Sequence, residues 1–146
     1  MAAGYSGTPL AKKLGIKEGS ELVLVGAPEG WAVPDLPQGV AVRSTRRVPA
    51  TRAAPSDVVV AFFRALASLQ RDLAALGELV FPAGGLWVAW PRKTTGHVSD
   101  ITDNDIRDVA LPLGLVDNKI AAIDDDWSGL RVVWRRELRV RVEPAA

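Results

Sequence analysis

The sequence predicts an α/β fold in three layers, a mostly parallel sheet with helices on both faces and a C-terminal antiparallel hairpin. Apolar strand candidates alternate along the chain with segments of helical periodicity, which is the pattern of a parallel sheet covered on both faces. Residues 57–63, DVVVAFF, are almost continuously β-branched and aromatic, as in strands that are buried on both faces. The length of 146 residues suits a single domain, residues 1–146, in which residues 1–7 and 143–146 are expected to be flexible.

The chain is expected to begin with a short helix and two strands. Thr8 is predicted to cap the helix, Pro9 to take its first position and Gly15 to end it in the left-handed conformation. Apolar runs predict strands over residues 21–25 and 40–44. Pro34 and Pro37 close a short helical turn that is predicted over residues 31–36.

The second half continues the alternation and ends in a hairpin. Leucines spaced by three, four and three residues from Leu66 to Leu76 predict an amphipathic helix that Gly77 ends. A strand over residues 86–90 follows, and Thr102 is expected to cap a helix that runs to about residue 111. The short join between residues 116–123 and 130–137 makes these strands antiparallel. One sheet is expected to bury Val23, Val25, Val59, Ala61, Val88, Ile120 and Val132.

Composition limits the classes of function. Hydrophobic residues make up 48% of the chain and charged residues 24%, which is ordinary for a soluble globular protein. No apolar run approaches the roughly 20 residues that span a membrane, and no signal peptide is visible, so a cytoplasmic protein is expected. Because the chain has no Cys and one His, we expect no metal site and no thiol nucleophile.

The net charge of +1 conceals segregated charges. Residues 43–52 hold four Arg and no acid, residues 100–126 hold eight Asp, and residues 131–141 hold five Arg and one Glu. Two explanations stay open: solvated faces, or complementary contact with a charged partner or a second copy of the chain. A homo-oligomer is therefore one of the outcomes that the sequence allows.

The order of elements, and the opening LAKKLGIKEGSELVLVGAPEG at residues 10–30, resemble the class I methyltransferase fold. The resemblance implies a reduced fold of that class with a cofactor loop after the first strand. Two features depart from it. Only Gly26 and Gly30 flank the loop, in which Pro28 lacks an N–H donor. The second strand ends in Arg43-Ser44-Thr45-Arg46-Arg47, where the family usually has an acid that holds the cofactor ribose. We therefore expect no cofactor.

A second resemblance covers nearly the whole chain. YSGTPLAKKLGI at residues 5–16, GAPEG at residues 26–30, LWVAWPRK at residues 86–93 and VALPLGLVDNKIAAIDDDWSGLRVVWRR at residues 109–136 are similar to a family of small actinobacterial proteins, domain-of-unknown-function family 3052. This resemblance implies a shared fold and brings no activity with it.

Candidate site residues lie where strands are expected to end. Loops that follow parallel strands share one edge of a sheet, and open α/β sheets bind ligands there. The segments after residues 25, 63 and 90 should therefore meet, with Thr102 near them. Each segment can also be a plain turn or a basic surface loop. The ligand-binding candidates on this edge are Ala27, Glu29, Trp31, Trp90, Arg92, Lys93 and Thr95.

Other motifs carry less chemistry. Trp127 at the hairpin turn either folds over the core or offers its ring to a partner, which makes it a partner-binding candidate. Asp124-x-Asp126 opens like a calcium loop, but Arg135 stands where the bidentate acid is needed. His97 has no evident orienting partner, so no catalytic residue is assigned.

Three functions are compatible with these residues. The first is a non-catalytic binding or regulatory protein that acts through a protein or small metabolite at the rim. The alternative is a small transferase-like enzyme with a nonstandard cofactor pocket at the same rim. The third is a nucleic-acid accessory protein, which is disfavoured because the chain is not strongly basic and has no RNA-binding signature.

Overall fold

The computed structural model describes residues 8–49, 55–93 and 99–140. They contain a six-stranded sheet in the order β2-β1-β3-β4-β6-β5, in which β1 to β4 are parallel and β6 is antiparallel to β4 and β5. The strands are β1 (Glu21–Val25), β2 (Ala41–Thr45), β3 (Val58–Phe62), β4 (Gly85–Pro91), β5 (Leu115–Ala122) and β6 (Trp127–Trp134). The predicted fold class is confirmed, including the terminal hairpin. The ends predicted to be flexible, residues 1–7 and 143–146, lie outside the described residues.

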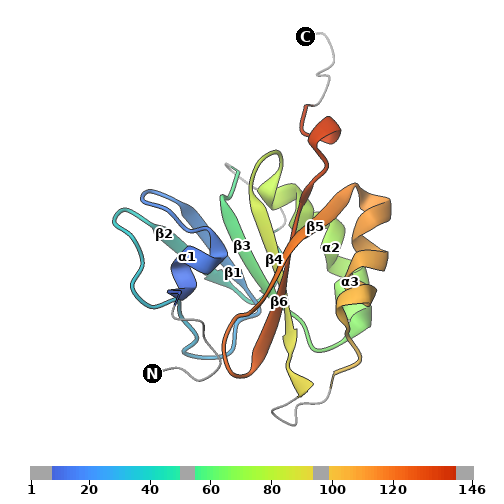
Figure 1. Ribbon diagram of the computed structural model, residues 1–146, viewed down its shortest axis with the longest axis horizontal. Coiled ribbons are helices and arrows are strands. Elements are labelled where there is room, and N and C mark those ends of the chain that lie inside the picture. The colour runs from blue at the N-terminus through green and yellow to red at the C-terminus, as the bar shows by residue number, and fades with distance from the viewer. Residues whose placement is uncertain (1–7, 50–54, 94–98, 141–146) are drawn as a thin grey trace.

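Helices cover both faces of this sheet (Figure 1). Alternate residues of β3 serve two cores: Val59 and Ala61 pack with α2 and α3, whereas Val58 and Val60 pack with α1. All five residues of β3 are buried, as expected for a central parallel strand. The helices are α1 (Leu10–Leu14), α2 (Leu66–Val80) and α3 (Asp103–Ala110), with 3-10 turns at Leu111–Leu113 and Arg136–Leu138.

Local sequence sets the ends of the helices. Thr102 and Asp105 form a capping box at the start of α3: the Thr102 side chain accepts from the Asp105 N–H at 3.3 Å, and the Asp105 carboxylate accepts from the Thr102 N–H at 2.9 Å. Gly15 ends α1 at φ 81°, as predicted. The prediction that Thr8 caps α1 is wrong. Pro9 itself is the N-cap residue, with ψ at 143°, so Thr8 lies one residue too early.

Two further helical predictions are corrected. No helix forms over residues 31–36, because Pro34 and Pro37 each disfavour the helical conformation of the preceding residue, and Asp35 adopts φ 55°. Gly77 does not end α2, which continues to Val80. A Cβ at Gly77 would lie 3.1 Å from the Leu115 side chain, so this glycine permits β5 to pack closely on the helix.

The predicted core is confirmed at six positions and wrong at Ile120, whose exposed fraction is 55%. Ile120 lies on β5, the outermost strand, after a register shift between Asp117 and Lys119. Arg107 of α3 contacts Asp117, so the helix is anchored to the earlier part of β5, and Ile120 lies beyond that contact. Edge position and the bulge therefore override the apolar pattern.

Candidate functional site

The main candidate site lies where the chain changes direction along the sheet. From β1 the chain moves outward to β2, and from β3 it moves the opposite way to β4. Ligands of open parallel sheets bind outside the carboxyl ends of the strands at such a point. A pocket of about 580 Å³ opens there, which is the size of a small-molecule site. This switch-point pocket is lined by Val25, Gly26, Arg46, Arg47, Val48, Phe62, Phe63, Arg64, Ser68, Arg71 and Asp72.

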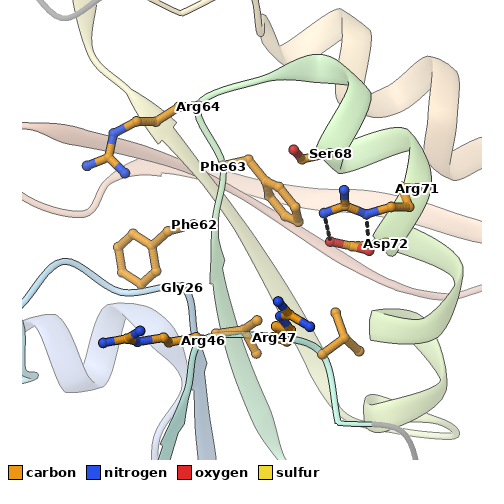
Figure 2. Close-up of a pocket in the computed structure, with 11 residues that line it drawn as sticks. Gly26, Arg46, Arg47, Phe62, Phe63, Arg64, Ser68, Arg71 and Asp72 are labelled. Atoms are coloured by element: carbon orange, nitrogen blue, oxygen red, sulfur yellow. Dashed lines mark hydrogen bonds and ion pairs between the residues drawn. The ribbon is translucent and has the colours of Figure 1, made fainter.

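The lining of this pocket is strongly basic, with four arginines against one aspartate. Arg71 pairs with Asp72 through Nε–Oδ1 at 3.0 Å and Nη2–Oδ2 at 3.1 Å (Figure 2). The hydrogen bonds to this carboxylate, and its charge, raise the pKa of Arg71. Within the described residues, no acid pairs with Arg46, Arg47 or Arg64. The pocket therefore has an excess of positive charge that its own side chains do not neutralise.

The arginines lie on two sides of the end of β3 (Figure 2). Arg46 and Arg64 lie on either side of the Phe62 ring, whereas Arg47 lies beside Phe63 and faces the Arg71–Asp72 pair. Packing orients Arg64, because its guanidinium carbon is 5.0 Å from the centre of the buried Trp127 ring. The pocket lining therefore contains arginines from three separate segments of the chain, with Arg46 and Arg64 on the Phe62 side of β3 and Arg47 and Arg71 on the Phe63 side (Figure 2).

Backbone geometry at the end of β1 brings these segments together. Gly26 adopts φ 69°, and its N–H donates to the Thr45 carbonyl at 2.8 Å, which ties the end of β1 to the end of β2. A Cβ at Gly26 would lie 3.3 Å from the Phe62 carbonyl oxygen. The Thr45 side chain accepts from the Arg47 N–H at 3.1 Å, so a local turn holds Arg47 at the rim.

The structure places the candidates after β1 outside the switch-point pocket. Ala27 and Trp31 are half-buried on the α1 face of the sheet, and Glu29 is exposed. The Trp31 indole donates to Asp124 Oδ2 at 2.9 Å and packs edge-on against Phe62, with ring centres 4.8 Å apart. These contacts give Trp31 a packing role beside the pocket.

The candidates after β4 lie at the same edge of the sheet in a separate hollow. This hollow of about 280 Å³ contains Trp90, Arg92 and Lys93 together with Thr102. Arg92 is held by the hairpin turn, because its guanidinium donates to the Asp124 carbonyl at 3.1 Å. Thr95 lies outside the described residues. The candidate residues therefore share an edge, as β1, β3 and β4 are parallel, but do not share one pocket.

Trp127 takes the first of its two predicted roles and folds over the core. Its exposed fraction is 5%, and its ring packs edge-on against Phe62 at 5.0 Å between centres. Its candidacy as an exposed partner-binding residue is corrected accordingly, because a buried ring offers no docking surface.

The arginines that line the switch-point pocket are not among the residues predicted from the sequence to bind a ligand. In the sequence, Arg46 and Arg47 stand out only as part of a basic segment and as residues at a position where an acid is usual. Arg64 lies two residues after β3, in a segment separated in the sequence from Arg46 and Arg47. The available signal was position, because all three arginines lie within two residues of the end of a parallel strand, and such ends meet at one edge of a sheet.

The described residues contain no helix that is both long and apolar enough to cross a membrane. In the same residues, no three His, Cys, Asp or Glu side chains gather in a way that could hold a metal ion.

Solved structures of similar architecture include methyltransferases that use S-adenosylmethionine (SAM). A SAM-dependent methyltransferase from Aquifex aeolicus aligns with a TM-score of 0.55 and 13% identity over 84% of this chain and 86% of its own. Magnesium protoporphyrin IX methyltransferase from Synechocystis PCC 6803 with bound SAM aligns at 0.60 and 10% identity, over 86% and 74% of the chains. A fibrillarin pre-rRNA processing protein from Methanococcus jannaschii aligns at 0.55 and 13% identity, over 82% and 68%. These likenesses show a methyltransferase-like fold.

Sequence comparison adds nothing to this result. No family model matches the chain, and no curated protein matches it significantly.

Proposed function

We propose that this protein is a small transferase-like enzyme whose nonstandard cofactor or substrate pocket is the switch-point pocket. One observation carries the proposal. In a sheet that resembles those of methyltransferases, a basic pocket of about 580 Å³ lies at the carboxyl ends of β1, β2 and β3, the position where this class of sheet binds ligands. Three arginines of the lining, Arg46, Arg47 and Arg64, pair with no acid among the described residues. The expected ligand is therefore an anionic small molecule.

The residues present do not fit the usual mode of binding SAM. The acid that would hold a cofactor ribose after the second strand is replaced by Arg46 and Arg47, which lack acceptor atoms. Pro28 removes one N–H donor from the loop after β1. We derive no methyl transfer from this fold, and we expect SAM to bind more weakly than micromolar.

A non-catalytic binding protein is the second candidate. The observation that favours it is the state of Asp72, the acid of the pocket lining, which is engaged by Arg71 and is poorly placed to act as a general base. Such a protein would bind the same anionic ligand without converting it.

A ligand screen tests the shared part of both candidates. Titration calorimetry should detect no stoichiometric micromolar site for SAM or S-adenosylhomocysteine, whereas anionic metabolites should raise the melting temperature of the protein. Amide chemical shifts of Gly26 and Arg64 should move with the bound ligand. A tight SAM site at these amides would restore ordinary methyltransferase chemistry, and turnover of a bound ligand would separate the enzyme from the binding protein.

Membership of the actinobacterial family named above, and a cytoplasmic location, belong to this proposal as well. The motifs at residues 26–30 and 86–93 support the first.

A further inference from the structure

We infer that the ligand of the switch-point pocket carries phosphate, and that a nucleoside diphosphate is the simplest molecule of that class to fit. This inference rests on the proposed function, because it concerns the same pocket. It goes further by assigning the chemical group that the arginines recognise.

The distribution of charge favours phosphate over a single carboxylate. One carboxylate can occupy one or two guanidinium groups, whereas Arg46, Arg47 and Arg64 approach from different directions and none pairs with an acid among the described residues (Figure 2). A diphosphate spreads about three negative charges over several oxygens, and arginine binds phosphate oxygens in pairs. The number and spread of unpaired guanidinium groups match such a group.

The start of α2 adds one further polar group to the pocket. Ser68 lies in the first turn of α2 and lines the pocket. That first turn contains no acidic residue, and the N-cap residue Ala65 makes no side-chain hydrogen bond to it. The Leu66 N–H donates to Asp100 at 2.7 Å, but Asp100 does not line the pocket. Ser68 therefore adds a hydroxyl donor beside the arginines, and the Asp100 carboxylate offsets part of the partial positive charge of this 15-residue helix.

The replacement of an acid by arginine at the end of β2 fits the same ligand. In dinucleotide-binding sheets, an acid at this place holds the ribose 2′-hydroxyl, and an arginine accommodates a phosphate on that hydroxyl instead, which shows that arginines at this position can bind a phosphate group. Arg46 and Arg47 stand directly after β2, and Gly26 keeps the neighbouring end of β1 free of a side chain. The pocket volume of about 580 Å³ is large enough for a nucleotide.

The test compares adenosine diphosphate with adenosine, which differ only in the phosphates. Calorimetry on the full chain should show at least about tenfold tighter binding of the diphosphate, and Arg46→Ala/Arg47→Ala should lower that affinity by about tenfold or more. Pyrophosphate should compete. The matched control is Arg43→Ala, which removes an exposed charge of the same basic segment on β2 that does not line the pocket. It should change affinity by less than about twofold.

Each outcome separates the inference from the proposed function. Equal binding of adenosine and its diphosphate, with shifts at Gly26 and Arg64, would overturn the phosphate assignment and keep the pocket. Equal losses in the Arg43 and Arg46/Arg47 variants would show diffuse attraction to the basic segment, which also overturns it. Shifts confined to other amides would remove the pocket as the ligand site, and the proposed function with it. Urea unfolding of both variants should match the unchanged protein, since exposed charges contribute little to folding.

Discussion

The two edges of the parallel sheet carry pockets of nearly equal size and different charge. The switch-point pocket measures about 580 Å³, and a pocket at the amino ends of β1, β3 and β4 measures about 570 Å³. The first is lined by four arginines and one aspartate. The second, the amino-edge pocket, is lined by Lys17 and Arg131 against Glu18 and Asp57. Size alone therefore does not distinguish a ligand site on this sheet, whereas charge and topology do.

Backbone contacts at the amino edge explain part of the difference. Gly84 N–H donates to Val80 O at 2.8 Å and Gly85 N–H donates to Asp57 O at 2.9 Å, which closes the loop before β4 onto the start of β3. The Asp57 carboxylate accepts from the Glu21 N–H at 2.8 Å, so this acid is committed to the backbone. The amino edge uses its polar groups for packing, and the carboxyl edge leaves its arginines available.

The largest predicted effect breaks the sheet that both edges share. Val59→Asp would place a charge on β3, at a position with an exposed fraction of 0%, and should destabilise the protein by more than about 4 kcal/mol. The matched control is Val42→Asp on the outer strand β2, where the side chain is 48% exposed, and its cost should be below about 1 kcal/mol. Urea unfolding measures both. Similar stabilities of the two variants would show that β3 is not the central strand.

Effects of intermediate size are expected from replacing a glycine at each edge, where Gly84 is required by close packing and Gly26 by its backbone conformation. A Cβ at Gly84 would lie 2.4 Å from the Ser56 carbonyl oxygen, which is backbone, so Gly84→Ala should cost about 3 kcal/mol. Gly26→Ala should cost about 1–2 kcal/mol, mainly because Gly26 adopts φ 69°.

Thermal and urea denaturation check the order of these two costs. In addition, Gly26→Ala should weaken binding at the switch-point pocket, whereas Gly84→Ala should leave the affinity of the folded protein unchanged. A Gly84→Ala variant as stable as the unchanged protein would contradict the close approach of β3 and the loop before β4.

The smallest predicted effect concerns Arg131 at the amino edge. Burial, and then the charge of Arg139, lower the pKa of Arg131, and no described acid pairs with it. A lowered pKa disfavours the charged form of a cation, so the folded state holds this charge at a cost wherever Arg131 is protonated in both states. Arg131→Met should therefore stabilise the protein by roughly 0.5 kcal/mol.

Two measurements sharpen this last contrast. The gain in unfolding free energy should be the same at about pH 5 and about pH 9, because arginine stays protonated throughout that range. The affinity for adenosine diphosphate should stay within about twofold, since Arg131 does not line the switch-point pocket. If Arg131→Met lowered the affinity as much as Arg46→Ala/Arg47→Ala, the ligand would bind at the amino edge, and the assignment to the switch-point pocket would be wrong.

The sequence by itself determined the fold class and most of its elements. Continuous apolar strands, leucine spacing in α2, the Thr102 cap and the left-handed Gly15 are local or periodic signals, and the sequence predicted each of them. The edge on which a site should lie was also predictable, because parallel strands send their following loops to one side.

Tertiary structure alone decided which residues form the site. Arg46 and Arg47 follow β2 and Arg64 follows β3, and only the order β2-β1-β3 brings those two strand ends together around the end of β1. In the sequence, Trp31 and Trp127 look the same as aromatic residues that bind a ligand or a partner. In the structure, both pack against Phe62. The predictions that Gly77 ends α2 and that Ile120 is buried were wrong. Gly77 allows β5 to approach the helix closely, and Ile120 is exposed because β5 lies at the edge of the sheet. Such outcomes depend on contacts between distant segments, and periodicity and local propensity carry no information about those contacts.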